Sequence, residues 1–248
     1  MKINLPIFPI SVSLNRKLKV YKSKIVNRDY DKVFVIGFNK TGTTTLKKIL
    51  EVFGFKIGNQ IAAEVLGIEW GQTGDVRKII NYCYTAEAFQ DSPFSRANLY
   101  KELDKAFPNS KFILTVRDDE NQWFKSLVKF HTKMFSSDPS RPPSEADLGN
   151  SIYRYKGMML DDYKAFFNYS AVPLYDKKQY TDMYLKHIND VESYFSNRPN
   201  VMLKINVSNP DDFKRLIGFL NIETSMKDFP WHNKTKRKDF PWQNKNIK

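Results

Sequence analysis

The clearest change in hydrophobic spacing along the chain comes near its amino end. Residues 33–36 (VFVI) form a short, unbroken and largely β-branched apolar run, the pattern of a buried strand. A turn with Gly37 and Gly42 follows. From Thr43 onward the apolar residues take helical spacing, at Leu46, Ile49, Leu50 and Phe53. The pattern therefore predicts a strand, a glycine-bearing turn and a helix.

The rest of the chain alternates between short apolar runs and stretches with helical spacing. Four further runs predict strands, at residues 54–58, 85–91, 111–117 and 201–207. Helical spacing predicts helices in parts of 61–82 and over residues 99–107, 182–195 and 211–220. Another predicted helix carries along one side Trp123, Leu127, Phe130 and Met134. This alternation of short strands and helices predicts an α/β fold.

The turn after the first predicted strand has the composition of an anion-binding loop. Gly37 and Gly42 permit a tight curl that points successive N–H groups inward, and the helix N-terminus adds unpaired donors and partial positive charge. Lys40 adds a full charge, and hydroxyl donors follow at Thr41, Thr43, Thr44 and Thr45. The alternative is a structural turn of an ordinary α/β protein, in which the threonines only cap the helix.

The position of the lysine distinguishes this loop from the loops that bind ATP and GTP. The signature of those loops, GxxxxGK[ST], fits the glycine spacing, but Thr43 stands where the lysine belongs. The sequence GFNKTGTT instead resembles the 5′-phosphosulfate loop of the sulfotransferases, close to PKTGTT or PKSGTT, with Asn39 in place of the usual proline. Those enzymes use 3′-phosphoadenosine-5′-phosphosulfate (PAPS) and release 3′-phosphoadenosine-5′-phosphate (PAP). The resemblance implies a P-loop NTPase-like sulfotransferase fold, a three-layer α/β/α domain with a mostly parallel sheet of about five strands, which the predicted strands fit. It also implies cofactor contacts from Asn39, Lys40, Thr41, Gly42, Thr43, Thr44 and Thr45.

A second segment, KFILTVRDDENQWFKS, is similar to the part of sulfotransferases that holds the 3′-phosphate of the cofactor. The matching residues are Arg117, at the end of a predicted strand, and Ser126, on the helix that follows. An arginine can make bidentate contact with a phosphate. Ser126 follows Arg117 by nine residues, one more than is usual in that family. The alternative for Arg117 is a surface arginine that pairs with Asp118 or Asp119.

The carboxyl end of the chain carries a third, weaker similarity. Residues 229–233 (FPWHN) resemble a terminal FPHxN segment of one branch of sulfotransferase-like proteins, with the histidine shifted by one position. The resemblance makes Asn233 and Lys234 candidates for cofactor binding, with Lys236 or Arg237 as further possibilities. The alternative for the sequence beyond residue 236 is a disordered basic tail.

The resemblance implies transfer of a sulfuryl group from PAPS to a hydroxyl or amine acceptor. Lys40 is expected to stabilise the bridging oxygen of the donor, and no metal is expected to be required. The acceptor needs a general base, for which Asp91, at the end of a predicted strand, is the first candidate. Glu87 and His131 are the other candidates, whereas His187 is interpreted as a structural hydrogen-bonding residue. Asp91 could instead be a helix cap or a structural loop residue.

The chain is interpreted as one domain with two flanks. Residues 1–31 are expected to be an N-terminal extension or to include a short first strand, 32–234 a single sulfotransferase-like domain, and 235–248 a basic tail. Within the domain, residues 136–149 are predicted to be a loop or lid, and 136–184 a lid or acceptor region. The aromatic residues of that region fit two interpretations, packing against the core or a wall that binds a small-molecule or carbohydrate acceptor.

The strongly basic charge balance leaves two other functions open. The formal net charge of +13 favours anionic partners, and a protein that binds anions or nucleic acid without catalysis is one alternative. A nucleotide kinase-like P-loop phosphotransferase is the other, against which the position of Lys40 argues. The sulfotransferase interpretation expects no nucleic acid partner.

Two further features concern the compartment. Cys83 is the single cysteine, so an intrachain disulfide is impossible. No apolar run approaches the roughly 18 residues of a membrane span, and Pro6 and Pro9 interrupt the apolar stretch near the amino end. A cytoplasmic protein is therefore expected.

Overall fold

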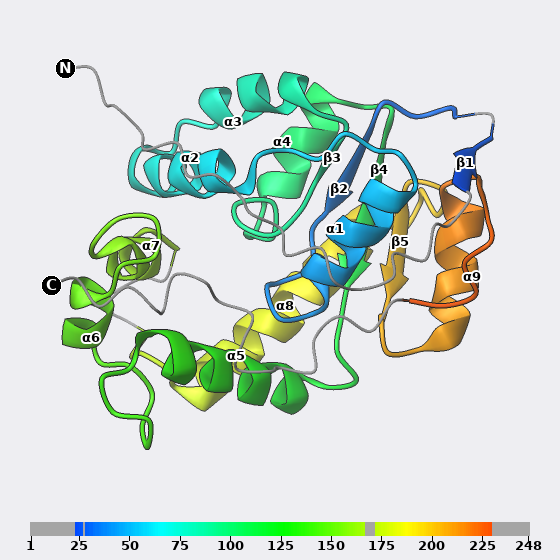
Figure 1. Cartoon of the computed structure of the whole chain (residues 1–248). Helices are drawn as coiled ribbons and strands as arrows, with labels where there is room; N and C mark the ends of the chain where they lie inside the picture. The colour runs from blue at the N-terminus through cyan, green and yellow to red at the C-terminus, as the bar shows by residue number, and fades with distance from the viewer. Residues whose placement is uncertain (1–22, 27, 167–171, 230–248) are drawn as a thin grey trace, which may run out of the picture.

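The computed structural model describes residues 23–26, 28–166 and 172–229, and its strands form two sheets (Figure 1). The larger sheet has four parallel strands in the order β3-β2-β4-β5. These strands are β2 (Lys32–Val35), β3 (Ala88–Phe89), β4 (Ser110–Thr115) and β5 (Met202–Ile205). The smaller sheet is an antiparallel pair, β1 (Ser23–Ile25) and β6 (Ile222–Thr224).

Helices cover both faces of the parallel sheet, which confirms the predicted α/β/α arrangement (Figure 1). One face carries α1 (Thr43–Val52) and α9 (Pro210–Phe219). The other carries α2 (Gln60–Thr73), α3 (Arg77–Tyr82), α4 (Leu99–Ala106) and α8 (Lys177–Phe195). Beyond the carboxyl ends of the strands lie α5 (Glu120–Phe135), α6 (Glu145–Asn150) and α7 (Met158–Phe166). A short 3-10 helix, Cys83–Thr85, precedes β3.

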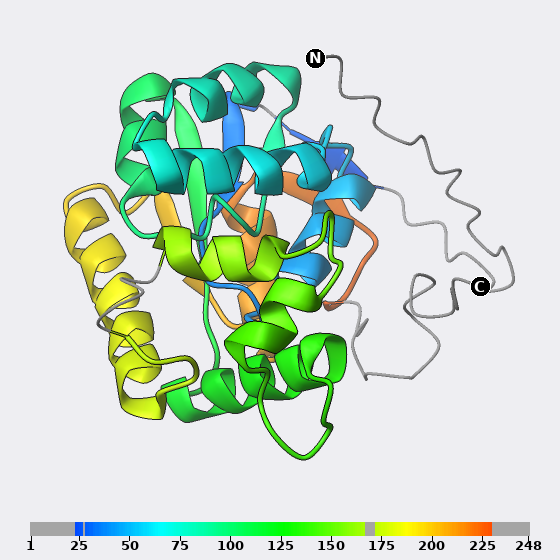
Figure 2. The ribbon, with the colours of Figure 1, turned by 90° about the vertical axis from the view of Figure 1, so that its left-hand side faces the viewer.

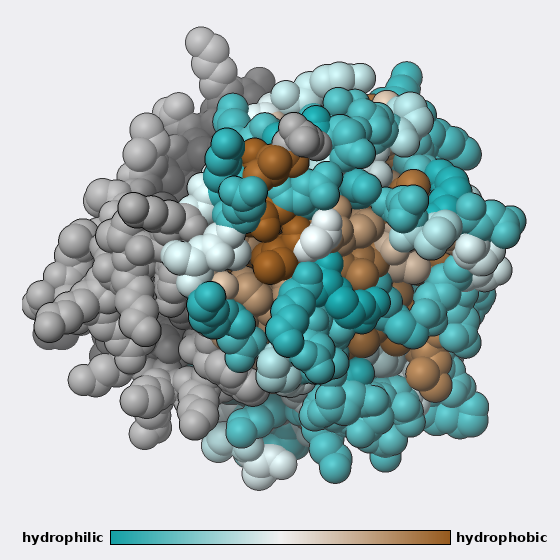
Figure 3. All heavy atoms as spheres, turned by 90° about the vertical axis from the view of Figure 1, so that its right-hand side faces the viewer, coloured by the Kyte–Doolittle hydropathy of each residue, from teal (hydrophilic) through white to brown (hydrophobic). Residues whose placement is uncertain are grey.

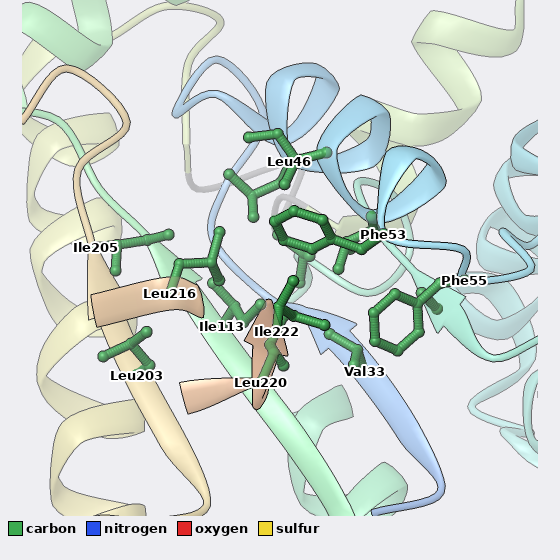
Figure 4. Packing of buried hydrophobic residues seen from close by; sticks show 14 of the residues in the cluster. Val33, Leu46, Phe53, Phe55, Ile113, Leu203, Ile205, Leu216, Leu220 and Ile222 are labelled. Carbon is green, nitrogen blue, oxygen red and sulfur yellow. The ribbon is translucent and has the colours of Figure 1, made fainter. Parts of the chain in front are cut away.

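Alternate residues of the central strand serve the two faces of the sheet. Val33 and Val35 pack with α1 and α9, whereas Phe34 and Ile36 belong to the cluster on the opposite face. Figure 4 shows the first cluster, in which side chains of α1 and α9 meet those of the strands. The labelled members are Val33, Leu46, Phe53, Phe55, Ile113, Leu203, Ile205, Leu216, Leu220 and Ile222. This packing fixes the position of α1, and with it the loop that precedes α1.

Aromatic rings dominate the cluster on the opposite face. The fully buried ring of Phe34 lies 5.5 Å between centroids from both Phe89 and Phe112, and 6.0 Å from both Phe94 and Phe107. These rings come from neighbouring strands and from the connections after them. They join the middle of the sheet to the helical layer that covers it.

One predicted strand is absent from the described structure and another is shorter than predicted. Residues 54–58 do not form a strand, because Gly54 (φ 94°) ends α1 and Asn59 already caps α2, which leaves only an isolated bridge from Ile57 to Ala88. Of the predicted strand at 85–91 only Ala88–Phe89 is extended and paired. The parallel sheet therefore has four strands where about five were expected.

Local capping also changes two helical boundaries. The predicted lid at 136–149 contains the start of α6, because Ser144 and Asp147 form a reciprocal capping box. The helix predicted at 182–195 begins earlier, at Lys177, where Asp176 accepts a hydrogen bond from the Gln179 N–H at 2.8 Å.

The layer beyond the strand ends is seen most directly in Figure 2, where α7 crosses below α2. Gly71 permits this approach, since a Cβ atom there would lie 2.7 Å from the Cβ of Ala165. On the face shown in Figure 3, hydrophobic side chains gather near the centre and hydrophilic ones surround them. Within the described ranges, no helix combines the length and the apolar character needed to cross a membrane.

Candidate functional site

The predicted anion-binding loop lies between β2 and α1, at the carboxyl end of the parallel sheet. Gly42 has φ 106°, and a Cβ atom there would lie 2.4 Å from the Val207 side chain. At Gly37 a Cβ atom would lie 2.2 Å from the carbonyl oxygen of Thr115. Both glycines are therefore required. Gly37 allows close packing on β4, and Gly42 allows close packing on Val207 as well as a left-handed backbone.

Backbone donors at the start of α1 are free to bind an anion. The first helical hydrogen bonds run from the N–H groups of Thr45 and Leu46 to the Gly42 carbonyl, at 2.9 and 3.1 Å. Within the described part of the chain, the N–H groups of Thr43 and Thr44 make no hydrogen bond. Two inward donors at a helix N-terminus form a suitable site for a sulfate or phosphate group.

The threonines of the loop have different environments. The buried Thr41 hydroxyl donates to the Phe38 carbonyl at 2.5 Å and lies 2.6 Å from the Thr115 hydroxyl, so it braces the loop instead of facing a ligand. Thr43 donates to Asp91 Oδ2 at 3.3 Å. Thr44 is exposed and Thr45 is buried. The sequence alone did not separate these roles.

Lys40 has an unusual backbone and an unusual side-chain environment. Its φ is 68°, and its carbonyl accepts a hydrogen bond from Arg117 Nε at 2.6 Å. The ammonium nitrogen lies 3.8 Å from the ring centroid of Phe130. Burial and, to a smaller extent, the nearby charge of Arg117 together lower the pKa of Lys40 to about 8, although Asp91 acts in the opposite direction.

Arg117 follows β4 and lies against the same loop. Its backbone N–H donates to the Tyr184 hydroxyl at 2.9 Å, while its Nε is bound to the loop. Among the residues that the structure describes, its terminal guanidinium nitrogens make no hydrogen bond or ion pair, although Asp118 and Asp119 are adjacent in sequence. Burial lowers the pKa of the guanidinium. The predicted alternative of a surface pair with either aspartate is therefore not what the structure shows.

Helix α5 packs beneath the loop. Trp123 Nε1–H donates to the Asn39 carbonyl at 3.0 Å, and Phe130 contacts Lys40. Ser126 lies three residues after Trp123 and four before Phe130, so helical geometry places it on the side of α5 that faces the loop. The extra residue in the predicted spacing is thus compatible with a position near the loop.

Asp91 lies at the same edge of the sheet, shortly after β3, with φ 63°. Its carboxylate accepts hydrogen bonds from the Ser92 N–H at 2.9 Å and from the Thr43 hydroxyl, and no helix begins at it. Burial raises the pKa of Asp91, against the effect of these bonds and of Lys40. The carboxylate therefore binds Thr43 and lies close enough to the loop lysine for each to affect the pKa of the other.

A partly buried ion pair lies near Asp91. Arg154 Nε donates to Glu64 Oε2 at 2.7 Å, and its guanidinium carbon lies 4.4 Å from the ring centroid of Tyr153. Burial raises the pKa of Glu64, and Asp91 raises it further. The Tyr153 pKa is raised by burial and then by Glu64.

A second ion pair of the same kind lies between the segment after β3 and α7. Arg96 binds Asp162 at 2.5 Å and lies 4.2 Å from the ring centroid of Phe166. Its Nε–H is buried and has no hydrogen-bond partner. The two pairs place polar groups and aromatic rings near Asp91. The sequence did not indicate either pair.

The two other candidate bases lie at opposite ends of the sheet. His131 Nδ1 lies 2.9 Å from the Tyr175 hydroxyl, and burial, with Lys40 and Arg96, lowers the pKa of His131 to about 3. Glu87 precedes the first residue of β3 and pairs with Arg28 at 2.7 Å, so the structure does not bring it together with Lys40 and Asp91.

Three other expectations concern residues outside this group. His187 is buried, and its Nε2–H donates to the Ile36 carbonyl at 2.8 Å, which agrees with a structural role. Asn233 and Lys234 lie outside the described residues. In the described ranges, no group of three or more His, Cys, Asp or Glu side chains could hold a metal ion.

The structure is an α/β protein with a candidate anion site at the carboxyl edge of its parallel sheet, beside a lysine, an arginine and a carboxylate. The sequence model of the sulfotransferase domain matches residues 32–238. This chain therefore belongs to the sulfotransferase domain family, as the motif resemblance predicts. A comparison with curated proteins finds no match.

Proposed function

We propose that this protein transfers a sulfuryl group from PAPS to a hydroxyl or amine acceptor. The observation that carries the proposal is the grouping of Lys40 with Asp91, which accepts a hydrogen bond from Thr43, beside two free backbone donors. Lys40 and the backbone donors suit an anionic donor. Asp91 suits an acceptor that must lose a proton.

The residues present fit a donor with phosphate groups at two positions. The Thr43 and Thr44 amides would hold the 5′ end, and Lys40 would stabilise the oxygen that leaves with the phosphate. Arg117 would bind the 3′-phosphate with its two terminal nitrogens, and Ser126 would add a hydroxyl. Asn233 and Lys234 remain sequence-based candidates for the same cofactor.

Asp91 is the proposed general base. In the transfer, a bond forms between the acceptor oxygen or nitrogen and sulfur, and the bond from sulfur to the 5′-phosphate oxygen breaks. Asp91 takes the proton that the acceptor loses. Its burial raises its pKa, which increases its basicity, while Thr43 fixes the orientation of its carboxylate. His131 is the second candidate, held by Tyr175.

The proposed acceptor region is 136–184, and the acceptor is a small molecule or a carbohydrate. Arg154 and Asp162, from this region, form the ion pairs near Asp91, and Tyr175 holds His131. Aromatic rings beside hydrogen-bonding groups can bind sugars and other hydroxyl compounds. The placement of these residues supports the acceptor interpretation of the region.

Thermal unfolding with PAP, compared with ATP and Mg²⁺, tests the donor. A ligand at about 100 times its Kd adds roughly 2.7 kcal/mol, which raises Tm by roughly 5–10 °C for a chain of this size. We expect this rise with PAP and not with ATP and Mg²⁺. Transfer of radioactive sulfate from PAPS to a panel of phenols, amines and sugars then tests the reaction.

Three variants make the result specific. Lys40→Ala is expected to reduce turnover by about 100-fold or more, because it removes charge stabilisation in the transition state. Arg117→Ala is expected to weaken PAP binding, whereas Arg77→Ala, which removes an exposed arginine bound to Asp75, should not. A Tm rise only with ATP and Mg²⁺ would contradict the proposal and favour a phosphotransferase.

A further inference from the structure

The backbone of Lys40 is fixed before its side chain binds anything. Arg117 Nε–H donates to the Lys40 carbonyl at 2.6 Å, and Trp123 donates to the carbonyl of the preceding residue, Asn39, at 3.0 Å. Thr41, which follows Lys40, is held against β4 by the contact of its hydroxyl with the Thr115 hydroxyl. These contacts determine where the lysine side chain starts and leave its direction to its own surroundings.

The side chain ends on an aromatic ring. Lys40 Nζ lies 3.8 Å from the centroid of Phe130, well within the range of a cation–π contact. Across the described ranges, the ammonium forms no ion pair. Asp91 is close enough for each group to affect the other electrostatically, yet it is not the partner of the lysine.

An aromatic ring and a carboxylate hold a lysine differently. The ring attracts the ammonium through its quadrupole but carries no net charge and gives no strong hydrogen-bond acceptor. A carboxylate would neutralise the ammonium, occupy an N–H donor and lose its own capacity to take a proton. A direct pair between Lys40 and Asp91 would therefore disable both groups.

We propose that Phe130 is a positioning residue that holds the Lys40 ammonium apart from the Asp91 carboxylate. The lysine then stays available to the leaving oxygen and the aspartate to the acceptor proton. This inference rests on the proposed roles of Lys40 and Asp91. It concerns a contact from α5 that the anion-binding motif itself does not contain.

The proposal predicts a change in titration when the ring is removed. The charged and titratable groups around Lys40 are Asp91 after β3, Arg117 after β4 and His131 on α5. Asp91 is the only anion among these three groups. Without the ring, we expect the ammonium to pair with it, which raises the pKa of Lys40 from about 8 toward its ordinary value and lowers the pKa of Asp91.

The test compares Phe130→Leu with Phe130→Tyr, which keeps an aromatic face, and with Phe124→Leu. Phe124 is the matched control because it lies on the same helix against Tyr180. The pKa of Lys40 is measured, without donor, from the pH dependence of its acetylation by acetic anhydride, followed by mass spectrometry of the Lys40 peptide. PAP affinity and kcat are measured beside it.

For Phe130→Leu we expect a higher Lys40 pKa, a kcat reduced about tenfold and a smaller loss of PAP affinity. Phe130→Tyr and Phe124→Leu should behave as the wild type. A folded Phe130→Leu protein with the wild-type Lys40 pKa would overturn the proposal. If that variant does not fold, Phe130→Met provides the same comparison.

The two proposals fail in different ways. A wild-type protein that neither binds PAP nor transfers sulfate contradicts the proposed function. The acetylation measurement needs neither donor nor acceptor, so it still decides whether Phe130 keeps Lys40 and Asp91 apart.

Discussion

Lys40 shows how a single residue depends on parts of the chain that are distant in sequence. Its ammonium group contacts the Phe130 ring, and its carbonyl accepts a hydrogen bond from Arg117. Its backbone lies in the left-handed region. The lysine, the arginine and Asp91 were predicted because each follows an apolar strand in a local motif. Trp123 and Phe130 were predicted only as members of a helical face, since their contacts join positions more than 80 residues apart.

The lowered pKa of Lys40 predicts a pH dependence of PAP binding. Below about pH 8 the lysine is charged and attracts the anion, and above it the charge is lost. We expect the affinity of the wild type to fall by up to about tenfold per pH unit above that point. Lys40→Met should bind more weakly near pH 7 and lack this dependence. Isothermal titration calorimetry from about pH 7 to 9.5 measures both, and a flat wild-type profile would contradict the assignment.

At the scale of elements, long periodic segments were predicted more reliably than short ones. The strands at β2 and β4 and the helices α1, α4, α5 and α9 follow the apolar spacing closely. Residues 54–58 have the composition of a strand, but α1 ends at Val52 and α2 begins at Gln60, which leaves only an isolated bridge between them. The pairing of β1 with β6 joins segments about 200 residues apart, which local patterns cannot indicate.

The geometry of the turn between β2 and α1 indicates that Gly42→Ala will reduce both stability and PAP binding. A Cβ atom would meet Val207 at 2.4 Å on a left-handed backbone, so we expect a loss of about 1–3 kcal/mol and PAP binding weakened at least about tenfold. Gly218→Ala is the matched control. No atom lies within 4 Å of a Cβ there, and an alanine within α9 should be neutral or stabilising. Urea unfolding and PAP titration measure both effects, and normal binding by Gly42→Ala would refute the role of the loop.

For the whole molecule, the two helical layers depend on one central strand. Val33 and Val35 serve one face and Phe34 and Ile36 the other, so the anion loop emerges from a strand that is buried on both sides. The sequence predicted this segment as a buried strand. It did not indicate which rings would surround Phe34, because they come from four separate segments.

Removal of the Phe34 ring should therefore affect the entire domain. We expect Phe34→Ala to reduce the free energy of unfolding by about 3–5 kcal/mol and Tm by roughly 6–20 °C. Leu185→Ala, at a side chain that is 41% exposed on α8, should change stability by less than about 1 kcal/mol. Thermal and urea unfolding measure both variants. Equal stability of Phe34→Ala and the wild type would show that the aromatic cluster does not support the fold.

The pairing of β1 with β6 also determines where the chain can be shortened. Ser23 and Thr224 lie side by side, with their hydroxyl oxygens 2.8 Å apart, and the Val26 N–H donates to the Asn221 carbonyl. A recombinant chain that starts at residue 23 keeps the strand that pairs with β6 in the described part of the chain, whereas one that starts at residue 32, where the family match begins, removes that strand. The boundary suggested by family membership and the boundary set by hydrogen bonding thus differ by nine residues, and the second is the one to use for expression.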